Sequence, residues 1–202
     1  MNLIVLAASG RTGIELTRQA LRRGHTVTAI ARDPEKIAVP GSSALRRVGA
    51  DVNSPETIAS VIGAGSVILS GLGTDRPGVL AAGAKAVIAA GPRHIVWLGA
   101  YGTGRSAEAA GEASRVLGPL LGDRLADKVE ADTAVLDFGG TVFHAGFLDD
   151  GPESTERRTV GLMDAPILDL TAKISRATVA AAMLDEAETP RFAGSIAVPL
   201  SR

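Results

Sequence analysis

The sequence predicts an α/β fold in which a doubly wound, mostly parallel sheet is covered by helices on both faces. Short apolar runs recur along the chain with helical segments between them, which is typical of βαβ units. The first run, Leu3–Ala7, breaks into a glycine-rich turn and resumes as a helix. A length of 202 residues suits one domain with a core on each face of the sheet. We therefore expect a single Rossmann-like domain spanning residues 1–202.

Each strand is predicted from an apolar run. The predicted strands are Leu3–Ala7, Thr26–Ala31, Ala44–Val48, Val67–Ser70, His94–Leu98, Thr141–His144 and Ile196–Leu200. Helices are predicted over Thr12–Arg23, Val79–Ala90 and Asp123–Leu136. The glycine-rich stretch from Gly99 to Gly118 and the polar stretch Asp149–Arg158 are expected to be long loops. Both follow strands whose carboxyl ends should border a ligand crevice.

The turn after the first strand has the residues that a dinucleotide requires. Gly10 and Gly13 lack a Cβ, so the backbone can turn tightly, a pyrophosphate can approach, and the helix can pack closely on the sheet. Ala7 stands where the usual motif has its first glycine, and a small residue should be tolerated there. The amides at the start of the helix favour an anion. The alternative is an ordinary strand-to-helix turn, but its place between two strands favours a cofactor site.

The end of the second strand indicates which cofactor is bound. Arg32 stands where a carboxylate would accept a hydrogen bond from the ribose of NAD, and an arginine can instead pair with the 2′-phosphate of NADP. NADP(H) is therefore expected in preference to NAD(H), although Asp33 could serve NAD. Arg11 either clamps the same phosphate from the other side or is a solvated surface arginine.

Composition excludes several classes of function. The formal net charge is −1 and the charges are scattered, so we expect neither nucleic acid nor a membrane surface as a partner. With no cysteine and three widely separated histidines, we expect no metal site and no thiol chemistry. No apolar run is long enough to cross a bilayer, and no leader segment is evident, so a cytoplasmic location is expected. Redox chemistry would come from a bound cofactor.

Taken together, the segments resemble one known group of proteins. The matching motifs are Ala-Ser-Gly-Arg-Thr-Gly (8–13), Ala-Arg-Asp-Pro-Glu-Lys (31–36), Gly-Ala-Asp-Val (49–52), Val-Ile-Leu-Ser-Gly-Leu-Gly (67–73), Ala-Gly-Phe-Leu-Asp-Asp-Gly-Pro (145–152) and Ile-Ser-Arg-Ala-Thr-Val-Ala (174–180). The chain resembles the atypical short-chain dehydrogenase/reductase proteins of the NmrA-like, NAD(P)H-binding kind. Within them it is most similar to the biliverdin reductase B (NADPH-dependent flavin reductase) family, nearly from end to end.

The resemblance implies a set of cofactor-binding residues. Those expected to contact the cofactor are Ala8, Ser9, Gly10, Arg11, Thr12 and Gly13 at the pyrophosphate, Arg32 at the 2′-phosphate, Asp51 and Val52 at the adenine, Gly71, Leu72 and Gly73 after the fourth strand, and Leu98, Gly99, Ala145 and Gly146 near the nicotinamide. Without the resemblance, Asp51 would be interpreted as a turn residue, and Gly71 and Gly73 as an ordinary loop.

The departures from the family bear on the chemistry. Many relatives carry a serine after the fifth strand, where this chain has Gly99. The Tyr-x-x-x-Lys pair of ordinary short-chain dehydrogenases is absent, because the chain's tyrosine is Tyr101 and Arg124 stands four residues before Lys128. In that pair the lysine lowers the pKa of the tyrosine so that it can exchange a proton with a substrate hydroxyl. Lys128 either reaches the cofactor ribose or substrate, or is a solvated lysine paired with Asp132.

His144 and a group of aromatic residues lie near the expected nicotinamide. His144 can titrate near neutral pH, so it is either a proton donor or a hydrogen-bonded strand histidine. Together with Tyr101 and Lys128 it completes the set of catalytic candidates. Trp97, Tyr101, Phe143 and Phe147 form either a substrate wall or, for the two on strands, core packing.

These observations lead to one expected function and two rivals. We expect an NADPH-dependent reductase that passes hydride to a flavin, quinone or conjugated carbonyl, because such transfer needs few acid–base groups. The part from about residue 144 to 202 would complete the substrate side. The partner would be this small-molecule acceptor, with the protein a monomer or homodimer. The alternative is a non-catalytic NADP(H)-sensing protein of the NmrA-like type. A nucleotide-sugar epimerase or dehydratase would need the missing pair and a C-terminal substrate domain.

Overall fold

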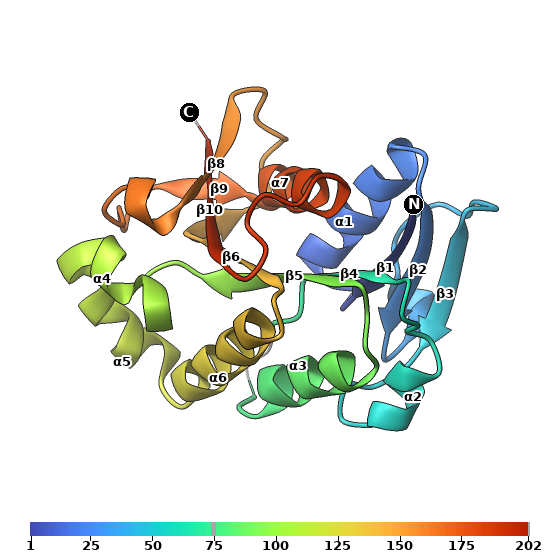
Figure 1. Cartoon of the computed structure of the whole chain (residues 1–202). Coiled ribbons are helices and arrows are strands. Elements are labelled where there is room, and N and C mark those ends of the chain that lie inside the picture. Colours follow the sequence, from blue (N-terminus) through green and yellow to red (C-terminus); the bar gives the residue numbers. More distant parts are fainter. Residues whose placement is uncertain (74–75, 202) are drawn as a thin grey trace.

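An eight-stranded sheet forms the centre of the computed structural model, which describes residues 1–73 and 76–201 (Figure 1). In spatial order its strands are β3 (Leu45–Gly49), β2 (Thr26–Ala31), β1 (Asn2–Leu6), β4 (Val67–Ser70), β5 (His94–Ala100), β6 (Thr141–Ala145), β10 (Ile196–Ser201) and β8 (Arg157–Gly161). The first seven run parallel, and β8 pairs antiparallel with β10 at the edge. The first six strands have the Rossmann order, so the predicted fold class is confirmed.

Helices cover both faces of this sheet (Figure 1). On one face lie α1 (Arg11–Arg22) and α7 (Arg176–Glu188), which pack against each other, and on the other lie α2 (Pro55–Ala59), α3 (Val79–Ala89) and α6 (Arg124–Asp137). Successive side chains along each strand alternate between the two cores, one on each face of the sheet. Leu3 and Val5 pack in the core under α1 and α7, whereas Ile4 and Leu6 pack in the core under α3 and α6. Trp97 and Phe143 are 1% and 0% exposed, so they are core residues and not a substrate wall.

The stretch from Gly99 to Gly118 was expected to be a loop, and this prediction is wrong. The strand β5 continues to Ala100, and the chain then forms 3-10 turns over Gly104–Ser106 and Gly111–Val116 and the short helices α4 (Ala107–Ala110) and α5 (Leu117–Leu121). The glycines sit at the joints, where Gly102 and Gly111 have positive φ angles of 93° and 72°. The residues between them are good helix formers, which the glycine count obscured.

The stretch Asp149–Arg158 was also expected to be a loop, and this is correct for its centre alone. The strand β7 (Phe147–Asp149) ends at the first residue of this stretch and pairs with β9 (Lys173–Ser175) in a two-stranded ladder. The strand β8 begins at Arg157. These three short strands were not predicted, because three-residue strands and a strand that begins Arg-Arg carry little hydrophobic pattern. A further 3-10 turn, Leu162–Asp164, follows β8, and Pro34–Lys36 forms one after β2.

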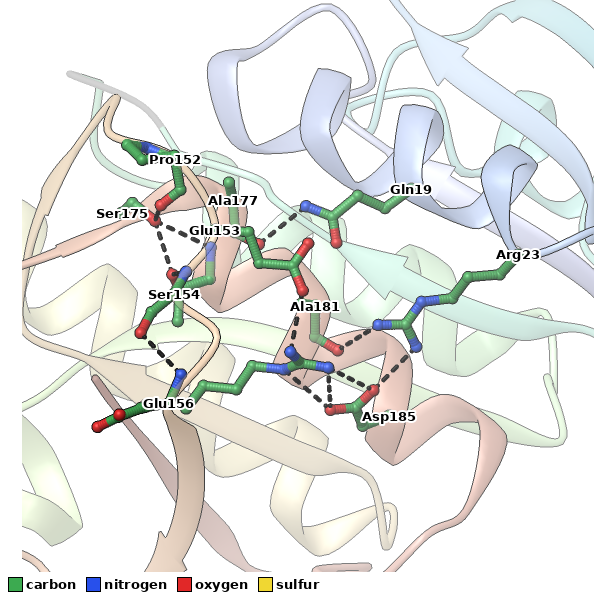
Figure 2. A network of polar contacts seen from close by, with 12 residues as sticks. Gln19, Arg23, Pro152, Glu153, Ser154, Glu156, Ser175, Ala177, Ala181 and Asp185 are labelled. Atoms are coloured by element: carbon green, nitrogen blue, oxygen red, sulfur yellow. Dashed lines mark hydrogen bonds and ion pairs between the residues drawn. The ribbon is translucent and has the colours of Figure 1, made fainter. Parts of the chain in front are cut away.

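Polar contacts fix the segment between β7 and β8 to the helices beneath it (Figure 2). The hydroxyl of Ser175, the N-cap residue of α7, donates to the Pro152 carbonyl at 2.7 Å, and the Ser154 amide donates to Thr178 Oγ1 at 2.8 Å. From α1, Arg23 donates to the Asp185 carboxylate at 2.9 Å. This segment is therefore anchored on α7, and α7 is tied to α1.

Candidate functional site

The turn between β1 and α1 leaves a row of backbone amides open at the carboxyl edge of the sheet. Gly10 is the N-cap residue of α1, and within residues 1–73 and 76–201 no side chain caps the helix. The Gly10 amide closes the turn by donating to the Ala7 carbonyl at 2.9 Å, and Ile14 makes the first backbone bond of the helix, to Gly10. The amides of residues 11–13 are thus without intrahelical acceptors. Such a helix start, with its positive dipole end, suits an anion.

Gly13 and Gly10 differ in how closely the backbone surrounds them. A Cβ at Gly13 would stand 2.1 Å from the Ala7 carbonyl oxygen and 2.7 Å from Ala8 Cα, so no side chain fits there. A Cβ at Gly10 would meet just one atom, Ala7 O at 3.2 Å. Gly71, after β4, lies against the same helix start, since its Cβ would be 3.2 Å from the Gly13 amide nitrogen. Gly13 therefore allows α1 to pack on the sheet, while Gly10 leaves space beside the amides.

A pocket of about 180 Å³ lies beside this turn, over the carboxyl ends of β1 to β4. Its lining residues are Leu6, Ala7, Ser9, Gly10, Ile30, Ala31, Arg32, Ala50, Asp51, Val52, Asn53, Leu72, Gly73, Arg76 and Val79. We call it the β1–β4 pocket. The strand order reverses between β1 and β4, and this switch point is where open α/β sheets bind ligands.

Most of the residues expected at the phosphate and adenosine ends are gathered here. Ser9, Gly10, Arg32, Asp51, Val52, Leu72 and Gly73 line the β1–β4 pocket, and Ala8, Thr12 and Gly13 are buried just beneath the turn. Arg76 also lines the pocket and was missed, because no motif surrounds it in the sequence. The Asp51 side chain accepts from the Asn53 amide at 2.9 Å and so shapes the loop that forms one wall.

Arg32 was expected at the 2′-phosphate, and Arg11 either as a second clamp on that phosphate or as a solvated surface arginine. Arg32 is exposed at the end of β2, lines the β1–β4 pocket, and makes no side-chain hydrogen bond within the described part of the chain. Asp33, beside it, is exposed, and its carboxylate accepts from the Glu35 amide at 3.1 Å as the N-cap of the 3-10 turn Pro34–Lys36. Arg11 instead lines a different pocket and donates to Asp150 at 3.0 Å. The Arg11 side chain is thus paired with Asp150 and does not line the β1–β4 pocket, where Arg32 lies.

Asp150 joins the starts of two helices. Arg11 is the first residue of α1 and Arg176 the first residue of α7, and both guanidinium groups contact this carboxylate, at 3.0 and 2.7 Å. Desolvation acts to raise the pKa of Asp150, but the hydrogen bonds from Arg11 and Arg176 outweigh it and lower that pKa. The segment after β7 is thereby held beside the glycine turn.

A second pocket, of about 250 Å³, lies at the carboxyl edge between β6 and β10. We call it the β6–β10 pocket. It is lined by Tyr101, Gly146, Pro166, Ile167, Leu168, Asp169, Ala172, Lys173, Ile174, Val198, Pro199, Leu200 and Ser201. Tyr101 is 4% exposed, and its hydroxyl donates to the Pro166 carbonyl at 2.7 Å. Burial raises the pKa of the Tyr101 phenol, so at neutral pH this hydroxyl stays a hydrogen-bond donor.

The remaining catalytic candidates do not line either of these two pockets. His144 is 1% exposed and hydrogen-bonds with Ser106 and Asp132, at 2.6 and 3.2 Å, as the alternative of a strand histidine requires. Lys128 is half-buried on α6 and makes no side-chain hydrogen bond or ion pair among the residues described. Asp132 therefore pairs with His144, and of the two alternatives for Lys128 the pairing with Asp132 is not the one found.

The other residues expected near the nicotinamide lie at the ends of the central strands. Leu98 and Gly99 are in β5, opposite Phe143 and His144 of β6, and Ala145 ends β6. Leu98 and Ala145 are 8% and 3% exposed, and Gly146 opens into the β6–β10 pocket. The ends of β5 and β6 therefore lie between the β1–β4 pocket and the β6–β10 pocket.

The family is decided by comparison with known proteins. The family model for NAD(P)H-binding proteins matches residues 7–190, which is nearly the whole chain. The chain belongs to the NAD(P)H-binding family. This agrees with the resemblance to NmrA-like, atypical short-chain dehydrogenase/reductase proteins that the motifs indicated.

Solved structures share the fold of this NAD(P)H-binding protein over almost its full length. An anaerobilin reductase from Escherichia coli is 16% identical, with a TM-score of 0.80 over 100% of this chain and 97% of that one. A protein from Bacteroides thetaiotaomicron, proposed to be an epimerase, is 25% identical, with a TM-score of 0.78 over 99% and 96%. A short-chain dehydrogenase/reductase from Veillonella parvula, in complex with NADP, is 16% identical, with a TM-score of 0.78 over 98% and 93%.

Among the residues that the structure describes, none belongs to a helix that could cross a membrane.

Proposed function

We propose that the protein is an NADPH-dependent reductase that passes hydride to a flavin, quinone or conjugated carbonyl acceptor. The observation that carries the proposal is the β1–β4 pocket, which lies at the switch point of the sheet, beside the uncapped start of α1, with Arg32 at its rim. The family and the reductases among the structural neighbours support the redox chemistry.

The residues of this chain suit a dinucleotide. The amides of residues 11–13 would hold the pyrophosphate, and the absence of a Cβ at Gly10 and Gly71 leaves the backbone accessible there. Arg32 would pair with the 2′-phosphate, which is the reason for the preference for NADP(H) over NAD(H). Asp51 and Val52 would border the adenine. The bound cofactor would supply the hydride.

The nicotinamide end would lie at the ends of the central strands, with the acceptor in the β6–β10 pocket. Gly71, Leu72 and Gly73 after β4 and the pairs Leu98–Gly99 and Ala145–Gly146 would border the ring. The wall of the β6–β10 pocket is apolar along Ile167, Leu168 and Val198, which suits a planar, weakly polar acceptor. All of its lining residues except Tyr101 lie between 146 and 201. This supports one domain over residues 1–202 whose part from 144 onward completes the acceptor side.

The proposal assigns proton supply to water and not to a side chain. His144 is buried in internal hydrogen bonds, Tyr101 donates to a backbone carbonyl, and Lys128 lines neither pocket. A flavin or quinone can take its proton from solvent after hydride transfer, so the proposed acceptors are those that need the least acid catalysis. Tyr101 would act as an aromatic face of the acceptor pocket.

Replacing Arg32 with alanine tests the cofactor. We expect the affinity for NADPH, measured by calorimetry, to fall by about 1–3 kcal/mol, the scale of a charge-assisted hydrogen bond, while the affinity for NADH stays the same. Arg46→Ala is the matched control, because Arg46 is exposed on β3 and does not line the pocket. Equal affinities of the unmodified protein for NADPH and NADH would contradict the assignment of Arg32.

The second candidate is a sensor of the NADP(H) redox state, and the internal hydrogen bonds of His144 and Tyr101 favour it. NADPH oxidation measured against a panel of flavins, quinones and enones separates the two functions. Turnover with any of these acceptors supports the reductase. Tight NADP(H) binding without turnover, together with self-association or partner binding that differs between NADPH and NADP⁺, supports the sensor.

A further inference from the structure

His144 joins three separate elements on the inner side of the site. It belongs to β6, and its Nδ1 lies 2.6 Å from the Ser106 hydroxyl, in the turn after β5. Its Nε2 lies 3.2 Å from Asp132 Oδ2, on α6. All three side chains are buried, at 1%, 0% and 5% exposure, so solvent does not compete for these bonds.

Through Ser106 the imidazole is connected to the acceptor side of the site. The Ser106 hydroxyl accepts from the Gly102 amide at 2.9 Å and lies 3.0 Å from the Thr103 carbonyl oxygen. Gly102 follows Tyr101, whose ring lines the β6–β10 pocket. The turn directly after Tyr101 is thus held through a buried hydroxyl that His144 contacts, and the Tyr101 amide itself donates to the Ala145 carbonyl of β6 at 2.8 Å.

The imidazole also explains the glycine at position 99. Gly99 pairs with His144 across β5 and β6, and a Cβ on Gly99 would stand 2.6 Å from His144 Cδ2 and 2.9 Å from Nε2. The same Cβ would be 2.9 Å from Asp132 Oδ2. Gly99 does not have a positive φ angle, so its backbone could be adopted by other residues. The glycine is required by space: His144 fills the volume that a side chain at 99 would occupy.

Asp132 depends on His144 in turn. Its second oxygen, Oδ1, is buried and makes no hydrogen bond within the described part of the chain. Among the described residues, the imidazole of His144 is therefore the hydrogen-bond partner of the Asp132 side chain. Loss of the imidazole would leave a buried carboxylate unpaired.

We propose that His144 is a positioning residue, which together with Gly99, Asp132 and Ser106 forms one unit that holds the turn carrying Tyr101 against the acceptor pocket. The effect on the acceptor rests on the proposed reductase function. The dependence of Gly99 and Asp132 on His144 does not.

The coupling between positions 99 and 144 is tested by thermal unfolding of Gly99→Ser, His144→Ala and the double variant. We expect Gly99→Ser to lower Tm strongly in the wild-type background and to have a much smaller effect in the His144→Ala background. Gly99→Ala is measured in both backgrounds as well, in case the serine variant does not fold. A Gly99 substitution that is harmless in the wild-type background, or equally harmful in both, would overturn the coupling.

The positioning role is tested with His144→Gln, whose amide can reach Asp132, and His144→Asn, whose shorter amide can reach Ser106. We expect a rise of roughly tenfold in KM for the acceptor with a smaller change in kcat, because the pocket wall is displaced while hydride transfer is retained. Amide exchange at Gly102, measured by NMR, should become faster, most strongly in His144→Gln, and the Kd for NADPH should stay the same. The control is His25→Gln, because His25 also bonds a carboxylate, Glu188 at 2.7 Å, but precedes β2, which lies four strands away from β6 in the sheet.

Two results would overturn the positioning role. A fall in kcat that removes a limb of the pH profile, with unchanged exchange at Gly102, would make His144 a proton donor. Lower Tm with unchanged KM and unchanged Gly102 exchange would make it a packing residue alone. If the wild-type protein oxidises NADPH with none of the acceptors, the reductase proposal fails, whereas the Gly102 exchange and the Tm coupling still decide whether His144 holds the turn.

Discussion

Ala7 has the backbone conformation for which the usual motif employs glycine. Its φ angle is +55°, in the left-handed region, where the Cβ of an ordinary residue costs about 1–2 kcal/mol. The turn keeps this strain because the Ala7 carbonyl accepts from the Gly10 amide and is packed against Gly13. The strain is therefore located at the point where the chain turns from β1 into the candidate phosphate site, as is common in functional turns.

The two glycines that follow are expected to respond differently to the same substitution. Gly13→Ala should lower the free energy of unfolding by roughly 1–3 kcal/mol or more, because its Cβ would overlap backbone atoms that cannot move aside. Gly10→Ala should leave stability within about 1 kcal/mol of wild type but weaken NADPH binding, since its Cβ enters the space beside the open amides. Urea unfolding and calorimetry measure the two effects. Equal stability losses at both positions would contradict this division.

Sequence spacing predicted both glycines but could not distinguish their roles. The distinction depends on the distance from Gly13 to the Ala7 carbonyl, which is set by how α1 packs on the sheet. The same applies to Arg11 and Arg32. Both were candidates for one phosphate, and the direction of the Arg11 side chain toward Asp150 is a long-range contact that no local pattern contains.

At the scale of elements, α3 is capped by a neighbouring helix. Its own N-cap residue, Gly78, has no side chain, and the Asp127 carboxylate of α6 accepts from the amides of Leu80 and Ala81 at 3.1 and 2.9 Å. Asp127 is 5% exposed, so these amides have exchanged water for one carboxylate. The contact fixes α3 against α6 and places a negative charge at the positive end of α3.

Removal of this cap is expected to be costly. Asp127→Ala should reduce the free energy of unfolding by about 1–3 kcal/mol, because buried amides lose their acceptor, and Asp127→Asn should lose less, because its carbonyl oxygen can still accept. Asp123→Ala is the control, since Asp123 directly precedes α6, the helix that carries Asp127, but is exposed. Chemical denaturation of the three variants checks the order. A loss no larger for Asp127→Ala than for Asp123→Ala would show that the cap contributes nothing.

The elements that carry strong hydrophobic patterns were those predicted from the sequence. The seven parallel strands and the helices α1, α3 and α6 lie within two residues of their predicted bounds. The short strands β7 to β9 and the helices α2, α4, α5 and α7 were not predicted, because tertiary contacts stabilise them more than local pattern does. Leu168, for example, in the irregular segment before β9, donates its amide to the Ala110 carbonyl of α4 at 3.0 Å. The β6–β10 pocket is lined mostly by the irregular segment before β9, by β9 itself and by β10, so its shape depends on tertiary contacts of this kind and could not be predicted.

At the scale of the whole molecule, a charged cluster joins the beginning of the chain to α7. Glu188 binds His25 at 2.7 Å and Arg23 at 3.0 Å, and the N-terminal amino group lies 3.2 Å from His25 Nδ1. Burial acts to raise the pKa of Glu188, but the bonds from His25 and Arg23 outweigh it and lower that pKa below its ordinary value of 4.5.

This lowered pKa determines the sign of a pH effect. A carboxyl group whose pKa is lower in the folded state stabilises the fold above its ordinary pKa, and this contribution is lost as the pH falls through the folded-state pKa. Glu188→Gln should therefore be less stable than wild type at pH 7, and the difference should shrink as the pH falls from about 5 to about 3. Thermal unfolding across this range measures it, with Glu156→Gln, an exposed carboxyl group on the segment before β8, as the control. A difference that is constant with pH would contradict the prediction.

The strand order at the far edge of the sheet imposes an order of assembly during synthesis. Within the described residues, β8 pairs in the main sheet with β10, and β10 separates it from β6. When β8 leaves the ribosome, its partner Ile196–Ser201 has not yet been made. The strands β1 to β6 can pair with one another before then, because each new strand finds its neighbour already present. The strands of the half that carries the glycine turn can thus all be paired in the nascent chain while β8 still exposes unpaired backbone. The arrival of β10 then pairs the free edges of β6 and β8 in one step.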